Sequence, residues 1–506
     1  MLSKIASASL VGIDAYVVEV QVDISFGIPG FVTVGLPDAA VRESKVRVRA
    51  ALRNCGFAFP SRKVTINLAP ADRRKEGSSF DLPISLGFLA HLGLFPQERL
   101  KDYLFLGELA LDGSLKPGKG ILAAAVLAKK KGFRGIVVPK DNEKEAALVK
   151  DLQIYGLDSL AQVVQLLNDS EEIKPTKYSL QDLLPRPHYD VDFQEIKGQQ
   201  HVKRAMEVAA AGAHNVLLIG PPGAGKTMLA RRLPTILPPM TFDEVIEVTR
   251  IYSAAGLLTD KGVVGDRPFR SPHHTASDAG LIGGGSIPRP GEISLAHRGV
   301  LFLDEFPEFK RRVLEDLRQP LEDGQVIISR AALSVSFPCS FMLVAAMNPC
   351  EDAYQGFLSS DIPCPESQRI RYYSKISGPL LDRIDIQAEV PKVDFQDIVR
   401  KDEGENSARI RERVIRARKR QWQRFKKRRI NCNAQMGNRE VKQYCSVDEE
   451  GRKLLEMAVN RLGFSARAYT RALKVARTIA DLEGEEKIRA IHVSEAIHYR
   501  MMDRYF

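Results

Sequence analysis

Residues 215–237, NVLLIGPPGAGKTMLARRLPTIL, establish the fold class of this chain. An apolar run ends in a glycine-rich turn, and a segment with helical spacing follows the turn. The turn has the form GxxxxGKT, in which backbone N–H groups converge on phosphate oxygens and the next helix adds positive potential at its N-terminus. We therefore predict a buried strand, a phosphate-binding loop and a helix. The loop residues are Gly220, Pro221, Pro222, Gly223, Ala224, Gly225, Lys226 and Thr227.

A second motif supplies the carboxylates that such a nucleotide site needs. Residues 300–305, VLFLDE, place two acids at the end of an apolar strand, where ligands bind in open parallel sheets. We predict that Lys226 contacts the β- and γ-phosphates of ATP and that Thr227 and Asp304 hold its Mg²⁺. Glu305 would be the general base that polarises the attacking water. The alternatives, a chance glycine-rich turn and a strand ending in solvated acids, do not explain why both motifs occur in this order.

A third apolar strand, in FMLVAAMNP, ends at Asn348. Its amide could orient the water near the γ-phosphate, or Asn348 could form a turn because it precedes Pro349. All three apolar runs are short enough to be strands buried on both faces of a parallel sheet. The pattern predicts an α/β core.

The 506 residues divide into three regions and a linker. Residues 1–168 combine alternating strands with helical runs, an α+β pattern. Residues 169–189 are polar and contain three prolines, so we interpret them as a linker. Residues 190–395 form the predicted nucleotide-binding core. Residues 396–506 repeat apolar positions at three- and four-residue spacing, which predicts a helical C-terminal domain.

Composition narrows the functional classes. Apolar residues make up 44% and charged residues 27%, as in soluble globular proteins. No run of about 18 apolar residues occurs, so we expect no membrane span and no membrane partner. Asp14 and Glu19 interrupt the apolar N-terminal stretch, which we interpret as a strand and not as a signal peptide. Six scattered cysteines favour free thiols, and we expect a cytoplasmic protein.

The basic residues are concentrated in one stripe. Residues 409–429 hold twelve Lys or Arg and one acid, so their net charge of +11 equals that of the whole chain. The arginines occur on all sides of the expected helix, which does not resemble one solvated face of a packed helix. Basic residues with interleaved aromatics suit phosphate contacts and base stacking. The candidate DNA contacts in this stripe are Arg420, Trp422, Lys426 and Arg428.

The alternative is a solvated linker helix, or a helix that pairs with acids of a neighbouring subunit. The stripe contains no motif for reading base edges. We therefore expect any DNA binding to be independent of sequence and strongly dependent on salt.

Several segments resemble one known family. They are PPGAGKT, PHHTASDAGLIGGG, PRPGEISLAHRGVLFLDEFPEF, LRQPLEDGQVIISR, AAMNPC and KISGPLLDRIDI. Together they closely resemble the magnesium-chelatase-like AAA+ ATPases known as the ComM or YifB family, over essentially the whole chain. The resemblance implies a P-loop AAA+ core with a parallel sheet and a helical C-terminal lid. It also implies an N-terminal domain that resembles the Lon protease domain (ribosomal S5 domain 2-like) and a homo-oligomer, a hexameric ring.

The resemblance assigns roles to two arginines. Arg383, in GPLLDRID, matches the arginine finger that stabilises charge on a neighbouring subunit's γ-phosphate. The alternative for Arg383 is a salt bridge within the subunit, to Asp382 or Asp385. Arg467, in FSARAYTR, matches the sensor-2 arginine that reaches from the lid to the γ-phosphate. Arg471, four residues on, would share a helix face with it and is the rival candidate.

Residues 321–338, LEDGQVIISRAALSVSFP, read as a hairpin. The segment resembles the pre-sensor-1 hairpin that lines the central pore in this group of ATPases. Arg330 is then the expected contact with a threaded or encircled strand. The alternative is a plain surface hairpin.

The chain departs from the family at a pair of C-x-C motifs that suggest a small metal knuckle. Here Cys350 is paired with Asp352 in the first motif, and Ile362 with Cys364 in the second. Since only half of the ligands remain, we predict no structural zinc.

The N-terminal domain also departs from Lon. Ser79 lies where a Lon-type nucleophile would lie, but a serine–lysine mechanism needs an amine base. The position that aligns with that lysine is Leu122, and Lys116 and Lys119 are out of register. We interpret this domain as a non-catalytic interaction module.

Two functions remain. The first is an ATP-dependent DNA motor that uses ATP and Mg²⁺ for branch migration or helicase activity in recombination, on branched or single-stranded DNA, as the resemblance to proteins of natural transformation implies. The second is a protein-remodelling ATPase that acts on a protein partner, as the magnesium-chelatase ATPase subunit does.

Overall fold

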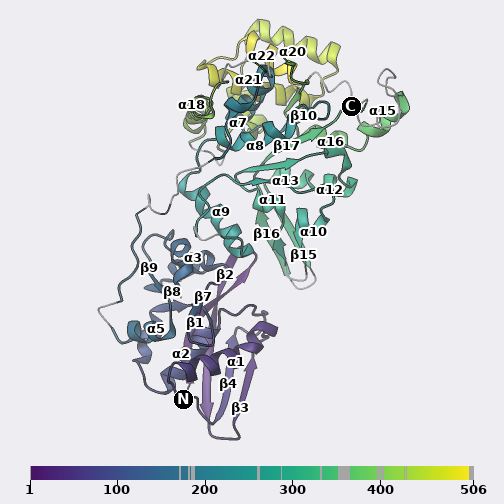
Figure 1. The fold of residues 1–506 in the computed structure, drawn as a ribbon. Helices are drawn as coiled ribbons and strands as arrows, with labels where there is room; N and C mark the ends of the chain where they lie inside the picture. The colour runs from purple at the N-terminus through teal and green to yellow at the C-terminus, as the bar shows by residue number, and fades with distance from the viewer. Residues whose placement is uncertain are drawn as a thin grey trace. The chain divides into compact units, whose positions relative to one another are not determined.

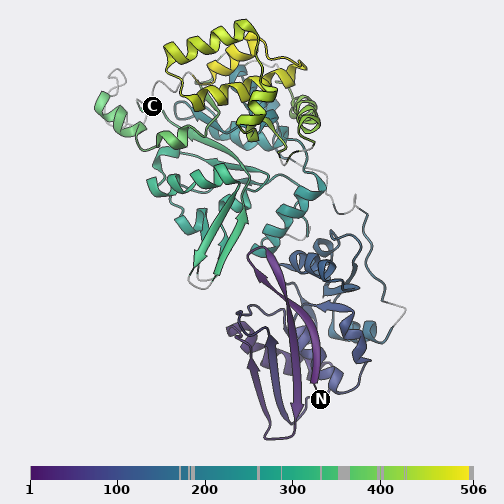
Figure 2. The same cartoon turned by 180° about the vertical axis from the view of Figure 1, so that it is seen from behind.

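A computed structural model describes most of the chain, in two compact units. The first unit comprises Met1–Arg186 and Thr241–Gly265, and the second comprises Pro187–Met240 and Asp266–Phe506 (Figures 1 and 2). The described residues are 2–169, 173–179, 183, 189–258, 262–285, 288–330, 333–350, 365–395, 399, 404–426, 428 and 430–500. Among them, no helix is long and apolar enough to cross a membrane.

A four-stranded sheet with the order β1-β2-β4-β3 forms the base of the first unit. Alternating residues of β2, such as Val18, Val20 and Val22, are fully or almost fully buried, because successive side chains of a strand point to opposite faces. Helix α2 packs on β1 and β2, so one of the expected helical runs of this region covers the sheet. The elements are β1 (Leu2–Val11), β2 (Asp14–Ser25), β3 (Gly30–Val34), β4 (Lys63–Ala69), α1 (Ala39–Asn54) and α2 (Asp81–His91).

A second, parallel sheet with the order β5-β8-β9 completes the α+β pattern of this unit. Helix α3 leads directly into β8 in this unit. The remaining elements are β5 (Tyr103–Phe105), β6 (Glu108–Leu109), β7 (Leu115–Lys116), α3 (Ile121–Lys131), β8 (Gly135–Pro139), α4 (Glu143–Ala146), β9 (Gln153–Leu157) and α5 (Leu160–Leu167).

Helix α9 (Phe242–Ala255) belongs to the first unit, although it lies between two core motifs in sequence. It packs on α3. The backbone N–H of Gly120 donates to the Ser253 carbonyl at 3.1 Å, and the Ser253 hydroxyl donates to the buried Glu145 carboxyl at 2.5 Å. Buried polar contacts thus attach α9 to the N-terminal residues.

The second unit is built on a five-stranded parallel sheet with the order β11-β14-β17-β10-β18. Every residue of β10, β14 and β17 is buried, which confirms the prediction of strands covered on both faces. Helix α8 packs against β14 and β17, and α7 against β18. The elements are α7 (Gln200–Gly212), β10 (Val216–Ile219), α8 (Lys226–Ile236), β11 (Phe269–Arg270), β14 (Val300–Leu303), β17 (Met342–Met347) and β18 (Ile386–Glu389).

The second unit also contains a hairpin and several short helices and strands. The predicted hairpin is present as β15 and β16, paired antiparallel. The elements are α10 (Asp278–Leu281), β12 (Gly283–Gly284), β13 (Arg289–Pro290), α11 (Glu292–Leu295), α12 (Arg311–Asp316), α13 (Arg318–Asp323), β15 (Gln325–Arg330), β16 (Leu333–Pro338), α15 (Glu366–Tyr373) and α16 (Gly378–Leu381).

The C-terminal region is helical, as predicted, and packs on the core helices. Helix α18 contacts α7, α8 and α21, and α21 contacts α7, so the lid and the sheet share one hydrophobic core. The elements are α18 (Ser407–Phe425), α19 (Asn438–Tyr444), α20 (Glu449–Leu462), α21 (Ala466–Glu483) and α22 (Ala490–His498).

Candidate nucleotide-binding site

The phosphate-binding loop connects β10 to α8, as the sequence predicts. Gly223 and Gly225 have φ values of 77° and 89°, a conformation that side chains with a Cβ rarely adopt. A Cβ on Gly220 would lie 2.1 Å from the carbonyl oxygen of Val390 on the neighbouring segment. The backbone conformation or the close packing at each of these three positions therefore requires a glycine. Together they turn the chain into the N-terminus of α8.

Lys226 is the first residue of α8, and its side chain points back into the loop. Its ammonium donates hydrogen bonds to the carbonyl oxygens of Gly220 at 2.6 Å and Pro221 at 2.9 Å. It also donates to the side-chain oxygen of Asn348 at 2.9 Å. Because β17 lies between β14 and β10, the end of β17 brings Asn348 to the loop. Asn348 thus does more than form a turn before Pro349.

The predicted magnesium ligands also meet. The Thr227 hydroxyl donates to an Asp304 carboxylate oxygen at 2.6 Å. A nucleotide-bound Mg²⁺ takes one or two protein ligands, and water and phosphate oxygens supply the rest. One hydroxyl and one carboxylate in contact fit that requirement, and no all-protein cage of three or more acidic, His or Cys side chains is present in the described part of the chain.

Glu305 adopts an unusual backbone conformation, with φ at 51°. A non-glycine residue in this left-handed region is uncommon and often marks a functional position. Its carboxylate contacts Nδ1 of His274 at 2.9 Å, and more than half of the Glu305 side chain is exposed. The ring of His274 lies edge-on to Phe309 and tilted against His273, which holds it in place.

His274 was not among the site residues predicted from the sequence. The segment PHHTASDAGLIGGG contributed to the family resemblance, but no residue in it received a role. The available signal was position: the two histidines follow β11, the strand beside β14, so the end of β11 lies next to the acids that end β14.

The Arg383 side chain is buried and makes its contacts within its own subunit. Its guanidinium pairs with Glu322 and donates to the Pro379 carbonyl. The two acids that sequence analysis considered as partners, Asp382 and Asp385, pair with other arginines. Burial lowers the pKa of Arg383, and nearby arginines lower it further. Its role as an arginine finger stays a prediction.

The two candidates for sensor 2 differ in their surroundings. Arg471 pairs with the buried Asp385, which also contacts His214. Burial alone would raise the pKa of Asp385, but Arg471 and His214 outweigh it and hold that pKa well below its usual range. Arg467 is 66% exposed and contacts Asp382 at 3.2 Å. Arg467 therefore has the greater freedom to reach a ligand, whereas Arg471 joins the lid to β18.

The basic stripe forms most of α18, and its inward face is part of the core. This corrects the expectation that the stripe does not pack: Ile410, Val414 and Phe425 are buried, as is Gln421. The Gln421 amide donates to the Ala211 carbonyl at 2.9 Å.

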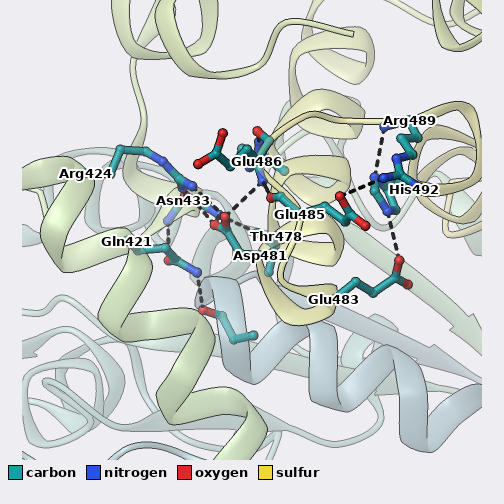
Figure 3. A network of polar contacts seen from close by, with 12 residues as sticks. Gln421, Arg424, Asn433, Thr478, Asp481, Glu483, Glu485, Glu486, Arg489 and His492 are labelled. Carbon is teal, nitrogen blue, oxygen red and sulfur yellow. Dashed lines mark hydrogen bonds and ion pairs between the residues drawn. The ribbon is translucent and has the colours of Figure 1, made fainter. Parts of the chain in front are cut away.

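Arg424 belongs to a buried network in the lid (Figure 3). It donates to both Asp481 carboxylate oxygens, at 2.8 and 2.5 Å, and the Asn433 amide also donates to Asp481 at 2.8 Å. Arg477 lies 3.1 Å from the same carboxylate. Arg424 is therefore structural. At the end of the stripe, Arg428 pairs with Glu440.

The outward face of α18 carries cations that have no carboxylate partner among the described residues. Trp422 is 37% exposed and lies on this side. Of the predicted DNA contacts, Arg420, Trp422 and Lys426 remain available to a ligand. The exposed basic side chains are Arg409, Arg416, Lys419, Arg420 and Lys426.

The hairpin carries Arg330 at the end of β15, exposed, with the tip at 331–332 outside the described residues. Asp352, Ile362 and Cys364 of the degraded metal knuckle also lie outside them. Cys350 is disulfide-bonded, which differs from the expectation of free thiols. The described free cysteines are Cys55, Cys339, Cys432 and Cys445.

In the N-terminal unit, Ser79 lies beside Gly118: a Cβ there would be 3.2 Å from its hydroxyl. Leu122, at the position of the Lon lysine, is fully buried in α3. The assignment of a non-catalytic module stays a prediction.

Comparison with known proteins identifies the family. Three family models match: magnesium chelatase subunit ChlI over residues 192–398, subunit ChlI of Mg-chelatase over 20–142, and the subunit ChlI C-terminal region over 404–500. The competence protein ComM of Haemophilus influenzae is 45% identical over 507 residues, covering 99% of this chain and 98% of the relative. The chain belongs to the ComM and YifB family of magnesium-chelatase-like AAA+ ATPases.

Two further relatives agree with that family. The YifB protein of Escherichia coli, itself described as uncharacterised, is 43% identical and covers 99% of this chain and 98% of its own length. Lon protease 2 of Bacillus subtilis is 25% identical over 216 residues, covering 41% of this chain and 35% of the relative. For a ComM/YifB-family chain, the loop and carboxylates described above indicate an ATPase that uses Mg²⁺.

Proposed function

We propose that this ComM/YifB-family ATPase is an ATP-driven DNA motor that promotes branch migration or strand separation during recombination. The observation that carries the proposal is the combination of an assembled nucleotide site with an outward basic face on α18, in a chain that is 45% identical to a competence protein. The alternative is a protein-remodelling ATPase, favoured by the matches to magnesium-chelatase subunit models.

The proposed chemistry begins at the loop. The backbone N–H groups at the start of α8 and the ammonium of Lys226 bind the phosphates and orient the γ-phosphorus for in-line attack. When bound, Mg²⁺ neutralises the charge that develops on the phosphate oxygens, and Thr227 and Asp304 would hold it. These residues stabilise charge and do not form covalent bonds to the substrate.

Glu305 and Asn348 act on water. The Glu305 carboxylate accepts the proton of the attacking water, and the Asn348 amide fixes the orientation of that water relative to the phosphate. His274 contacts one of the two carboxylate oxygens of Glu305, and we propose that Glu305 turns away from His274 when it accepts this proton.

We also propose that two arginines complete the nucleotide site when subunits assemble into a ring. Arg383 and Arg467 come from the same region of one subunit, since Asp382 pairs with Arg467 and precedes Arg383 in sequence. In the proposed hexamer, Arg383 would stabilise charge on a nucleotide held at the next subunit's loop, which couples hydrolysis to the subunit interface, and Arg467 would reach from the lid to the γ-phosphate.

The DNA role predicts a direct activity. The full chain should convert a labelled four-way junction into its duplex products only when ATP is hydrolysed, and Lys226→Ala should abolish conversion because phosphate binding is lost. A protein that hydrolyses ATP and binds the junction but leaves it unconverted would favour the protein-remodelling alternative.

A further inference from the structure

Helix α1 of the first unit presents a row of cations on one face. Arg42, Lys45, Arg49 and Arg53 are spaced by three or four residues, so their side chains lie on one side of the helix. All four are exposed, whereas Val48 and the other core-facing residues of α1 are buried.

These four cations have no carboxylate partner in the described ranges. The acid of the same helix, Glu43, lies 3.7 Å from Arg47. Arg47 itself points inward and donates to the fully buried Asp81 at 2.6 Å. The row therefore keeps its full charge for an external partner, and basic side chains without carboxylates suit a polyanion.

Aromatic rings lie under and beside the row. The Lys45 ammonium lies 5.8 Å from the centroid of the Phe31 ring, and the Arg49 guanidinium lies 5.5 Å from that of Phe59. Arg62, which precedes β4, has its guanidinium 4.5 Å from the ring centroid of Phe26, in the loop between β2 and β3. Phe26 is 87% exposed. A phenylalanine this exposed, beside cations, resembles a stacking platform more than a core residue.

The three cation–ring pairs belong to one surface. In the sheet, Lys63 of β4 pairs with both Ser25 of β2 and Gly30 of β3. Phe26 and Phe31 are the residues that follow Ser25 and Gly30 in the chain. The rings of Phe31 and Phe59 both pack against the ring of Phe88, with centroids 6.1 and 5.1 Å apart. Phe88 is buried and links these two pairs from beneath, and the Arg62–Phe26 pair lies where β2 ends and β4 begins.

We infer that this α1 surface, comprising Arg42, Lys45, Arg49, Arg53, Phe26, Phe31, Phe59 and Arg62, is a binding site for single-stranded DNA. The cations contact phosphates and Phe26 stacks on a base, which every base permits. This inference rests on the proposed function for the identity of the polyanion. It gives the N-terminal unit the task of holding a displaced strand.

The test uses the full chain and a fluorescent oligo(dT). Lys45→Glu with Arg49→Glu should weaken binding at least tenfold at low salt and should lower the slope of log affinity against log salt by about 1.4, because each lost contact to a single strand removes about 0.7. The matched control is Lys130→Glu with Lys131→Glu, an equal change of charge at exposed positions on α3 of the same unit, which should bind as wild type does.

Phe26→Ala is the second variant, since it keeps every charge. It should weaken oligo(dT) binding about tenfold and leave the salt slope unchanged, because stacking and not counterion release is lost. Basal ATP turnover should stay the same in all variants, and a thermal unfolding profile like that of wild type shows that the first unit of each variant is folded.

The outcomes separate this site from the motor. If wild type binds oligo(dT), DNA stimulates its ATPase, and both α1-surface variants bind like the control, the inferred site is wrong and the motor stands. If the variants lose binding while turnover is indifferent to DNA, the site stands and the motor fails. If wild type does not bind oligo(dT) at low salt, the inferred site is wrong, and the motor is then judged by its turnover on four-way-junction DNA.

Discussion

At the scale of residues, the nucleotide site was largely predictable. The loop and the acids after VLFL are local patterns, and the structure brings Lys226 to Asn348 and Thr227 to Asp304, whereas the roles of these residues stay predictions. The His274–Glu305 contact was not predictable in the same way. It depends on β11 lying beside β14 and on the left-handed backbone of Glu305, neither of which appears in a local pattern.

His274 should restrain hydrolysis in the absence of DNA. His274→Ala removes the contact that holds one Glu305 carboxylate oxygen, so we expect basal ATP turnover to rise several-fold and the ratio of DNA-stimulated to basal turnover to fall. The measurement is steady-state ATP hydrolysis with and without DNA.

His498→Ala is the control, since His498 is an exposed histidine of α22 that is not part of this site. A loss of turnover in His274→Ala, with His498→Ala like wild type, would mean instead that His274 positions Glu305 productively.

At the scale of elements, most strands and helices followed from periodicity, but α18 was misinterpreted. Because arginines occur on all sides of this helix, we did not expect it to have a buried face. Its buried face is formed by residues at helical spacing, which are Ile410, Val414, Ala417 and Phe425. The arginines on that face pair with acids from segments distant in sequence, such as Asp481 of α21. Such pairing could not be predicted from the stripe alone.

Arg424 should be needed for the stability of the lid. Arg424→Met leaves the buried Asp481 with Arg477 and Asn433 only, and we expect a loss of about 3 kcal/mol in the free energy of unfolding. Urea unfolding followed by the fluorescence of Trp422, the single tryptophan, reports on α18 directly.

Arg420→Met, on the exposed face of the same helix, is the control and should change that free energy by less than about 0.5 kcal/mol. Equal effects of the two substitutions would contradict the assignment of Arg424 to a buried network.

The docking of α9 should depend on pH through Glu145. Burial raises the pKa of Glu145 to about 7, although Ser253, Asn142 and Leu122 donate hydrogen bonds to its carboxyl. The native state therefore keeps a proton that the unfolded state loses, so stability is full below the usual pKa of 4.5 and falls as pH rises through 7. The loss amounts to about 3 kcal/mol.

Hydrogen exchange of Phe242–Ala255, corrected for the intrinsic effect of pH, measures this docking. Protection should fall by up to about a hundredfold between pH 5 and 8 in wild type. Glu145→Gln cannot ionise and should show little change over that range, whereas Asp151→Asn, which removes an exposed carboxylate, should behave as wild type does. A wild-type protection that does not vary with pH would exclude this role for Glu145.

At the scale of the whole molecule, the division into units was the least predictable feature. Thr241–Gly265 follows the loop helix in sequence, so it was assigned to the core, but its contacts with α3 place it in the N-terminal unit. Movement at the end of α8 or the start of β11 therefore has a covalent route to that unit, through the residues that flank α9. Family membership, in contrast, was evident from segments spread over the entire chain.

ATP turnover of the purified full chain, with and without single-stranded and four-way-junction DNA, tests the DNA motor most directly. Glu305→Gln is measured beside it. We predict that either DNA raises turnover several-fold at low salt, that the stimulation declines as salt rises, and that Glu305→Gln abolishes turnover. Turnover that requires Glu305 but is the same with and without DNA at every salt concentration would contradict the motor.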